Sequence, residues 1–134
     1  CHGLFRADNS MFSSLKLHDG WVTAGDVSLL NVQGATVTLS ACESGRSTVL
    51  NGDEAIGLVG AFFAAGAATV IASQWLVSDA ASALLMTQLH QHLKKGLKPA
   101  AALRAAQLEA RAEFSHPFFW AQFALMGKRE SVSV

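Results

Sequence analysis

The stretch VTLSACESG, residues 37–45, indicates both the class of fold and the position of a candidate site. Residues 37–39 are β-branched or apolar, as expected of a buried strand. The run stops at Cys42, in a cluster of small residues that ends at Gly45. A cysteine in the middle of such a run would be a core residue, whereas one at its end can be reached by another molecule. Cys42 is therefore the first candidate for a reactive residue.

The composition is that of a single domain with a hydrophobic core. The chain has 134 residues, of which 51% are hydrophobic, and ten acidic residues balance ten basic ones. This balance gives no electrostatic reason to expect nucleic acid or an anionic membrane as a partner. Two cysteines make no disulfide framework, and no Cys and His pattern has zinc spacing. We therefore expect a reducing, cytoplasmic setting and no metal or cofactor.

The pattern of apolar and turn-forming residues predicts alternating strands and helices. Asp19 and Gly20 predict a hairpin turn, and Thr23, with Asp26 three residues later, predicts the start of a short helix. The other predicted elements are strands at 36–41, 69–75 and 118–126, and helices at 53–65, 78–94 and 99–113.

This order of elements, with continuously apolar strands, predicts an α/β fold with a mainly parallel sheet and helices on both faces. Residues 55–77 carry no formal charge over a length that could span a bilayer, so a membrane helix is the alternative for this segment. We favour a helix with Gly66 as its C-cap, followed by a β-branched strand.

Cys42 is expected at the carboxyl end of a strand, where binding and catalytic residues gather in open α/β sheets. A thiol needs a base to act as a nucleophile near neutral pH. His2 is the candidate, because Gly3 after it lets the backbone approach a ligand and offers an unobstructed N–H. The residues between His2 and Cys42 include a predicted hairpin, helix and strand, which could return the chain to the adjacent strand end.

Five segments together resemble the CHAT domain, a bacterial caspase-like family often found beside tetratricopeptide repeats. The segments are CHG, WVTAGDV, LSACESG, NGDEAIGLVGAFFAAGAATVIASQWLVSDAAS and HPFFWAQFALMG. The likeness runs in order through nearly all of residues 1–127. It implies a caspase-like cysteine peptidase of the same broad group as separases and metacaspases.

The resemblance also implies roles for particular residues. His2 falls on the catalytic histidine and Cys42 on the nucleophile. The N–H groups of Gly3 and Cys42 would face the carbonyl oxygen of the scissile bond. Trp75 and Asp79 fall on a strand-end loop that helps to line the substrate cleft.

The caspase-like sheet carries strands before the histidine, and this chain begins one residue ahead of His2. The resemblance therefore implies a caspase-like three-layer sandwich that lacks its first strands. Residues 1–127 are interpreted as the C-terminal part of a CHAT domain, and residues 128–134 as a flexible tail. A tetratricopeptide-repeat or other regulatory domain is the expected partner, besides a protein or peptide substrate.

Each candidate residue also has a structural interpretation. Cys42 could be a small core residue, and His2 a frayed terminal one. Asp79 could stabilise a helix N-terminus, or it could favour a basic substrate residue before the cut. Trp75 could be a core residue or a cleft wall, and Ser40 could shape the same pocket without a charge preference.

The remaining histidines are interpreted as surface or loop residues; they are His18, His90, His92 and His116. His90 and His92 are two apart on a predicted helix and do not share a face, which argues against a metal pair.

Two functions remain in competition at this stage. The first is a cysteine endopeptidase that acts by thiolate attack and an acyl-enzyme, under control of a partner or an adjacent repeat domain. The second is a non-catalytic caspase-like scaffold that acts as a protein-interaction module. A serine hydrolase fits poorly, because the chain has no Gly-x-Ser-x-Gly elbow.

Overall fold

The computed structural model describes residues 2–4, 13–40, 52–75 and 78–127 of the chain. It contains two three-stranded sheets in these ranges. The smaller sheet is antiparallel and consists of β1 (His2–Leu4), β2 (Ser14–Lys16) and β3 (Trp21–Thr23). The central sheet has the order β4-β5-β6, from β4 (Thr36–Leu39), β5 (Thr69–Ser73) and β6 (Phe123–Gly127).

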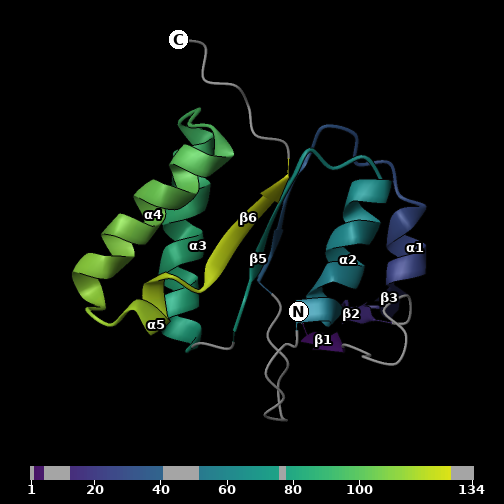
Figure 1. Cartoon of the computed structure of the whole chain (residues 1–134), viewed down its shortest axis with the longest axis horizontal. Coiled ribbons are helices and arrows are strands. Elements are labelled where there is room, and N and C mark those ends of the chain that lie inside the picture. The colour runs from purple at the N-terminus through teal and green to yellow at the C-terminus, as the bar shows by residue number, and fades with distance from the viewer. Residues whose placement is uncertain (1, 5–12, 41–51, 76–77, 128–134) are drawn as a thin grey trace.

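Helices lie on both faces of the central sheet, as predicted (Figure 1). On one face are α1 (Ala24–Ser28) and α2 (Gly52–Ala64). On the other are α3 (Asp79–Lys94) and α4 (Pro99–Glu113), with the short α5 (Pro117–Trp120) before β6. Every residue of β5 is buried, because this central strand is covered on both faces.

Alternation along β5 divides the core into two clusters. Val70 and Ala72 pack with α1 and α2, whereas Ile71 packs with α3 and α4. One face of α3 has an apolar residue every four positions, and Ala81, Leu85 and Leu89 on that face are fully buried. The facing side of α4 is a row of buried alanines, which lets the two helices approach closely; these are Ala102, Ala106 and Ala110.

The central sheet is mixed, so the prediction of a mainly parallel sheet is not confirmed for the described strands. β4 and β5 are parallel, but β5 and β6 are antiparallel. The physical reason is the number of helices in the connection. α3 runs away from the end of the sheet at which β5 stops, and α4 runs back toward it. β6 therefore starts at that end and runs antiparallel to β5.

The predicted strand at 118–126 is wrong in its first half. Pro117 starts the helical turn α5, and β6 begins only at Phe123. Proline is favoured in the first turn of a helix, and the Nδ1 atom of His116 accepts a hydrogen bond from the backbone N–H of Phe118 at 3.2 Å. His116, which we interpreted as a surface or loop residue, is exposed and caps this helical turn.

Local signals in the first part of the chain are confirmed. The hairpin between β2 and β3 closes with a hydrogen bond of 2.8 Å from the N–H of Leu17 to the carbonyl of Gly20. Thr23 and Asp26 form a reciprocal capping box at the start of α1. Hydrogen bonds from the Thr23 side chain and backbone hold the pKa of Asp26 below its usual value.

Gly66 closes α2 in a Schellman motif, as its predicted C-cap role requires. Its φ angle is +99°, and its N–H donates to the carbonyl of Phe63. The N–H of Ala67 donates to the carbonyl of Phe62, one residue before Phe63. α2 is therefore only 13 residues long, and among the described residues no helix has the length and apolarity to cross a membrane.

Gly66→Ala is expected to destabilise the domain by about 1–2 kcal/mol, because alanine rarely adopts a positive φ and its Cβ would meet the backbone and side chain of Gln33. Gly60→Ala is the matched control in the same helix, where an added Cβ meets nothing within 4 Å. It should stabilise by about 0.5–1 kcal/mol. Urea unfolding checks both values, and equal effects at the two positions would contradict this account of Gly66.

Candidate active site

The carboxyl ends of β4 and β5 form one edge of the central sheet. These strands are parallel, and Leu39 is paired with Ala72. Ser40, the residue directly after β4, is exposed at this edge. Cys42 follows two residues later and lies outside the described residues, so its predicted position at the strand end stays a prediction.

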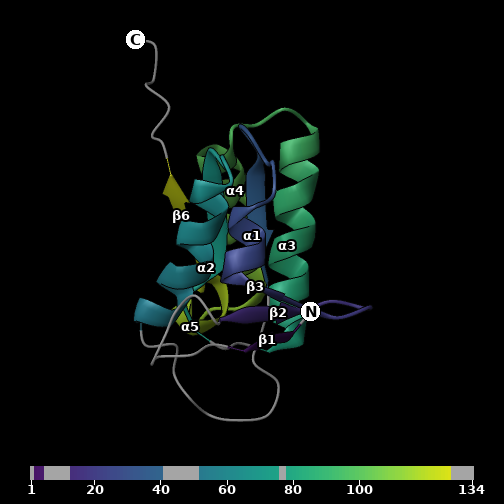
Figure 2. The same ribbon diagram turned by 90° about the vertical axis from the view of Figure 1, so that its right-hand side faces the viewer.

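His2 and Gly3 belong to β1, at the start of the small antiparallel sheet, where they pair with Lys16 and Leu15 of β2. We expected His2 at the carboxyl end of a strand beside β4; instead it is the first residue of β1, in the other sheet. The small sheet nevertheless lies at the same end of the molecule as the end of β5 (Figure 1), and at the same end as α5 in both views (Figures 1 and 2). Because Cys42 lies outside the described residues, the structure does not give the distance from His2 or Gly3 to Cys42.

Trp75, two residues after β5, is fixed by α5. Its indole Nε1–H donates a hydrogen bond of 2.9 Å to the carbonyl oxygen of Phe118. The rings of Trp75 and Phe118 are stacked, with centroids 6.3 Å apart and an interplanar angle of 22°. Trp75 is half-buried, so its side chain both packs against α5 and keeps some exposure to solvent. Its role as a wall of the substrate cleft stays a prediction.

A buried glutamine joins the segments that surround Trp75. Gln122 is 1% exposed, and its carbonyl oxygen accepts a hydrogen bond of 2.7 Å from the N–H of Gln74, next to Trp75. Its side chain accepts from the hydroxyl of Ser82 on α3 and donates to the carbonyl of Phe119 on α5. The end of β5, the first turns of α3 and the end of α5 are thus tied to one residue.

Asp79 is the first residue of α3, and the side chain of Ser78 caps the helix by accepting from the N–H of Ala81 at 3.4 Å. An acidic residue at this position stabilises the helix through its dipole. The Asp79 side chain is exposed just after the edge where β5 ends. Its position fits the predicted role at a helix N-terminus. Its predicted role in the substrate cleft stays a prediction.

Sequence reasoning missed Phe118 and Gln122 as parts of this region. Both fall in the segment that we predicted to be strand. The signal that could have identified α5 is the proline at 117 after a residue able to cap, which is typical of a helix start as well as of a helix end. No local signal indicates that Phe118 meets Trp75, because 43 residues separate them.

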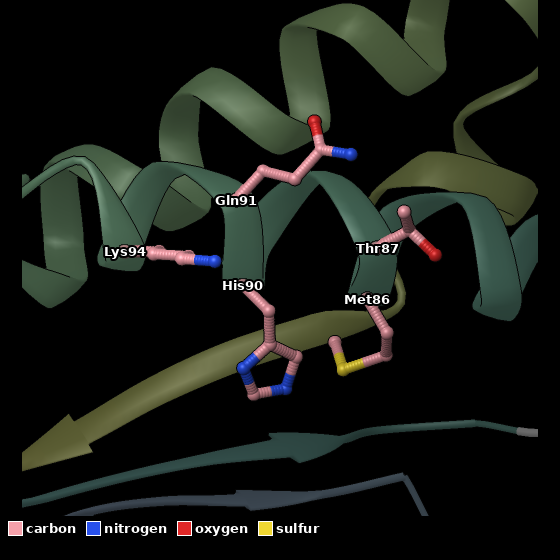
Figure 3. A pocket seen from close by; sticks show the side chains of 5 residues that line it. All are labelled: Met86, Thr87, His90, Gln91 and Lys94. Carbon is pink, nitrogen blue, oxygen red and sulfur yellow. The ribbon is translucent and has the colours of Figure 1, made fainter.

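A shallow groove of about 450 Å³ lies along the second half of α3 (Figure 3). It is lined by Met86, Thr87, His90, Gln91 and Lys94. His90 and Met86 point from the helix toward the strands, and His90 Nε2 lies 3.5 Å from the hydroxyl of Thr38 on β4. Asp79 begins the same helix more than one turn before these residues, so the groove does not include the strand-end residues.

The histidines and acidic residues of the described ranges are dispersed. His92 Nε2 lies 2.8 Å from a carboxylate oxygen of Glu109, which links α3 to α4, and His18 and His116 are exposed. Within these ranges, no three His, Cys, Asp or Glu side chains come together as a metal ion would require.

Comparison with known proteins establishes the family. The sequence model of the CHAT domain matches residues 1–128. This chain belongs to the CHAT domain family. The resemblance seen in the five sequence segments is thereby confirmed, and with it a place in the caspase-like peptidase superfamily.

Two curated relatives match this CHAT domain. Tetratricopeptide repeat protein 28 of Homo sapiens is 39% identical over 108 residues, which cover 79% of this chain. The Mus musculus protein of the same name is 35% identical over 108 residues. The matched region is 4% of the length of each relative. Both are tetratricopeptide repeat proteins by name, as the predicted association implies, and both are mammalian, so they do not support the predicted bacterial origin.

Proposed function

We propose that this CHAT domain is a cysteine endopeptidase in which Cys42 is the nucleophile and His2 the base. The observation that carries the proposal is the shared edge of β4 and β5 in a chain of this family. Cys42 follows β4 by three residues, and Trp75 follows β5 by two, so a rigid parallel pair supports both segments. The alternative is a non-catalytic interaction module on the same scaffold.

The proposed reaction proceeds through an acyl-enzyme. His2 takes the proton of the Cys42 thiol, and the thiolate attacks the scissile carbonyl carbon. The N–H groups of Gly3 and Cys42 stabilise the oxyanion that forms. The C–N bond then breaks as His2 returns the proton to the leaving amine. Water, deprotonated by His2, hydrolyses the thioester and restores the free thiol.

Ser40, Trp75 and Asp79 are proposed to line the substrate cleft. All three are placed by the ends of β4 and β5 or by the first turn of α3. Ser40 is uncharged, whereas the exposed carboxylate of Asp79 favours a basic residue before the cut. We also propose that a tetratricopeptide-repeat domain regulates this site in a cytoplasmic setting. The names of the two relatives support the repeat domain as a partner.

Alkylation by iodoacetamide tests the proposed pairing. At pH 7, Cys42 should react roughly tenfold faster than the same thiol in urea-unfolded protein, because an imidazolium partner lowers its pKa. His2→Ala should remove this excess. Cys1 should react at the ordinary rate, and His18→Ala, which changes an exposed histidine of the β2–β3 hairpin, is the matched control. Peptide mapping by mass spectrometry gives the rate at each cysteine.

Two results would count against the peptidase. The first is a Cys42 rate equal to that of the unfolded chain. The second is an enhanced rate that His2→Ala leaves unchanged. Either result would rule out His2 as the base that activates Cys42. A folded protein with an ordinary Cys42 thiol would favour the interaction module.

A further inference from the structure

Phe118 is an exposed aromatic residue at the edge where β5 ends. Its side chain is 45% exposed, although the neighbouring Phe119 is half-buried. It lies on α5, which is at the same end of the molecule as the carboxyl end of β5 (Figure 1). A single exposed apolar residue is common, but Phe118 is stacked on a second aromatic residue, Trp75, next to the end of β5.

The exposed surface that Phe118 shares with Trp75 is hydrocarbon. The one polar atom of the indole ring is already paired, since its N–H is bonded to the Phe118 carbonyl. The two rings are stacked, with centroids 6.3 Å apart and planes inclined by 22°, so their exposed parts lie next to each other. Such a surface gains most from contact with another apolar or aromatic group.

Contacts with neighbouring residues fix the positions of these two rings. The ring of Phe119 contacts that of Phe118 edge to face, with centroids 5.5 Å apart, and stacks on Phe114 on its other side. The N–H of Phe118 is bonded to the cap residue of α5, and Gln122 ties α5 to the residue before Trp75. Little conformational freedom remains to be lost when a ligand binds, which favours a binding role.

We propose that Trp75 and Phe118 together bind an apolar side chain of the peptide substrate, and that Phe118 is a specificity-determining residue. This inference rests on the proposed peptidase function and names its substrate class. Trp75 is two residues after the end of β5, and Phe118 lies on α5, the helical turn before β6. Leucine or phenylalanine, rather than arginine or aspartate, is the side chain that this surface selects.

Affinity labels for Cys42 provide the test. The probes are tetrapeptide chloromethyl ketones with alanine at every position but one, which is leucine, phenylalanine, arginine or aspartate in turn. At one position, leucine or phenylalanine should label Cys42 roughly tenfold faster than alanine, arginine or aspartate. Phe118→Ala should abolish this preference and leave the rate with iodoacetamide unchanged. Intact mass spectrometry measures the labelling rates.

Leu108→Ala is the matched control, because Leu108 is an apolar residue of similar exposure, 50%, on α4. It should leave the preference unchanged. Phe118→Leu, which keeps an apolar side chain and the backbone carbonyl, should keep part of the preference. Circular dichroism of all three variants confirms that each is folded before rates are compared.

The preference for apolar side chains is a ratio of labelling rates, so it can be measured even if Cys42 proves to be an ordinary thiol. The inference is overturned if no position prefers leucine or phenylalanine, or if the preference survives Phe118→Ala. Failure of the peptidase proposal has a different signature, namely an iodoacetamide rate at Cys42 that does not depend on His2.

Discussion

Cys42→Ala is expected to abolish peptide cleavage, with a loss in kcat/KM on the order of 10³-fold or more. The reason is that alanine has no nucleophile, and the remaining oxyanion donors and cleft residues contribute only a small part of the rate. Hydrolysis of a fluorogenic peptide library by the purified chain measures this loss. The library should include sequences with leucine, phenylalanine, lysine and arginine at the cleavage site.

Cys1→Ala is the control for this experiment, since it removes the other cysteine of the chain. It should leave kcat/KM within about twofold of wild type, as expected for a residue outside the reaction. Cleavage that persists undiminished in Cys42→Ala would show that Cys42 is not the nucleophile. Equal losses in both variants would indicate a general effect of removing thiols and would count against the assignment.

Leu58→Asp is expected to unfold the domain. The Leu58 side chain is 1% exposed and belongs to the cluster in which α2 packs with Val70 and Ala72 of β5. Burying an unpaired carboxylate there costs several kcal/mol, against a total stability of about 5–15 kcal/mol for an ordinary domain. Loss of the thermal unfolding transition, measured by circular dichroism, is the predicted result.

Gly60→Asp adds the same charge two residues later in α2, at an exposed position where a Cβ meets nothing within 4 Å. This variant should fold, with a midpoint close to that of wild type, because its carboxylate stays in water. A cooperative transition retained in Leu58→Asp would show that this face of α2 is not part of the core. Loss of the transition in both variants would mean that charge on the helix, rather than burial, is responsible.

Much of the local structure could be predicted because it depends on residues close together in the chain. The capping box of Thr23 and Asp26 spans three residues, and the turn at Asp19 and Gly20 is equally local. Gly66 ends α2 because its own backbone conformation has no steric penalty in glycine. The buried repeat of α3 follows from the 3.6-residue period of a helix.

The candidate site was predictable only to the level of strand ends. Ser40 and Trp75 follow two parallel strands, β4 and β5, although the predicted strands at 36–41 and 69–75 included both residues. The position of His2 was not predictable in this way. A short strand can pair with any available edge, and His2 begins a strand in the small antiparallel sheet rather than ending one beside β4.

By itself, the sequence determined the α/β class, the caps and turns, the two-sided burial of β5 and membership of the CHAT family. Only the tertiary structure decided the direction of β6, the helical turn at α5 and the contact of Phe118 with Trp75. The physical reason is the distance along the chain over which each feature is stabilised. A cap depends on neighbours within four residues, whereas the bond between the Trp75 indole and the Phe118 carbonyl joins residues 43 positions apart and requires the tertiary packing of the segments between them.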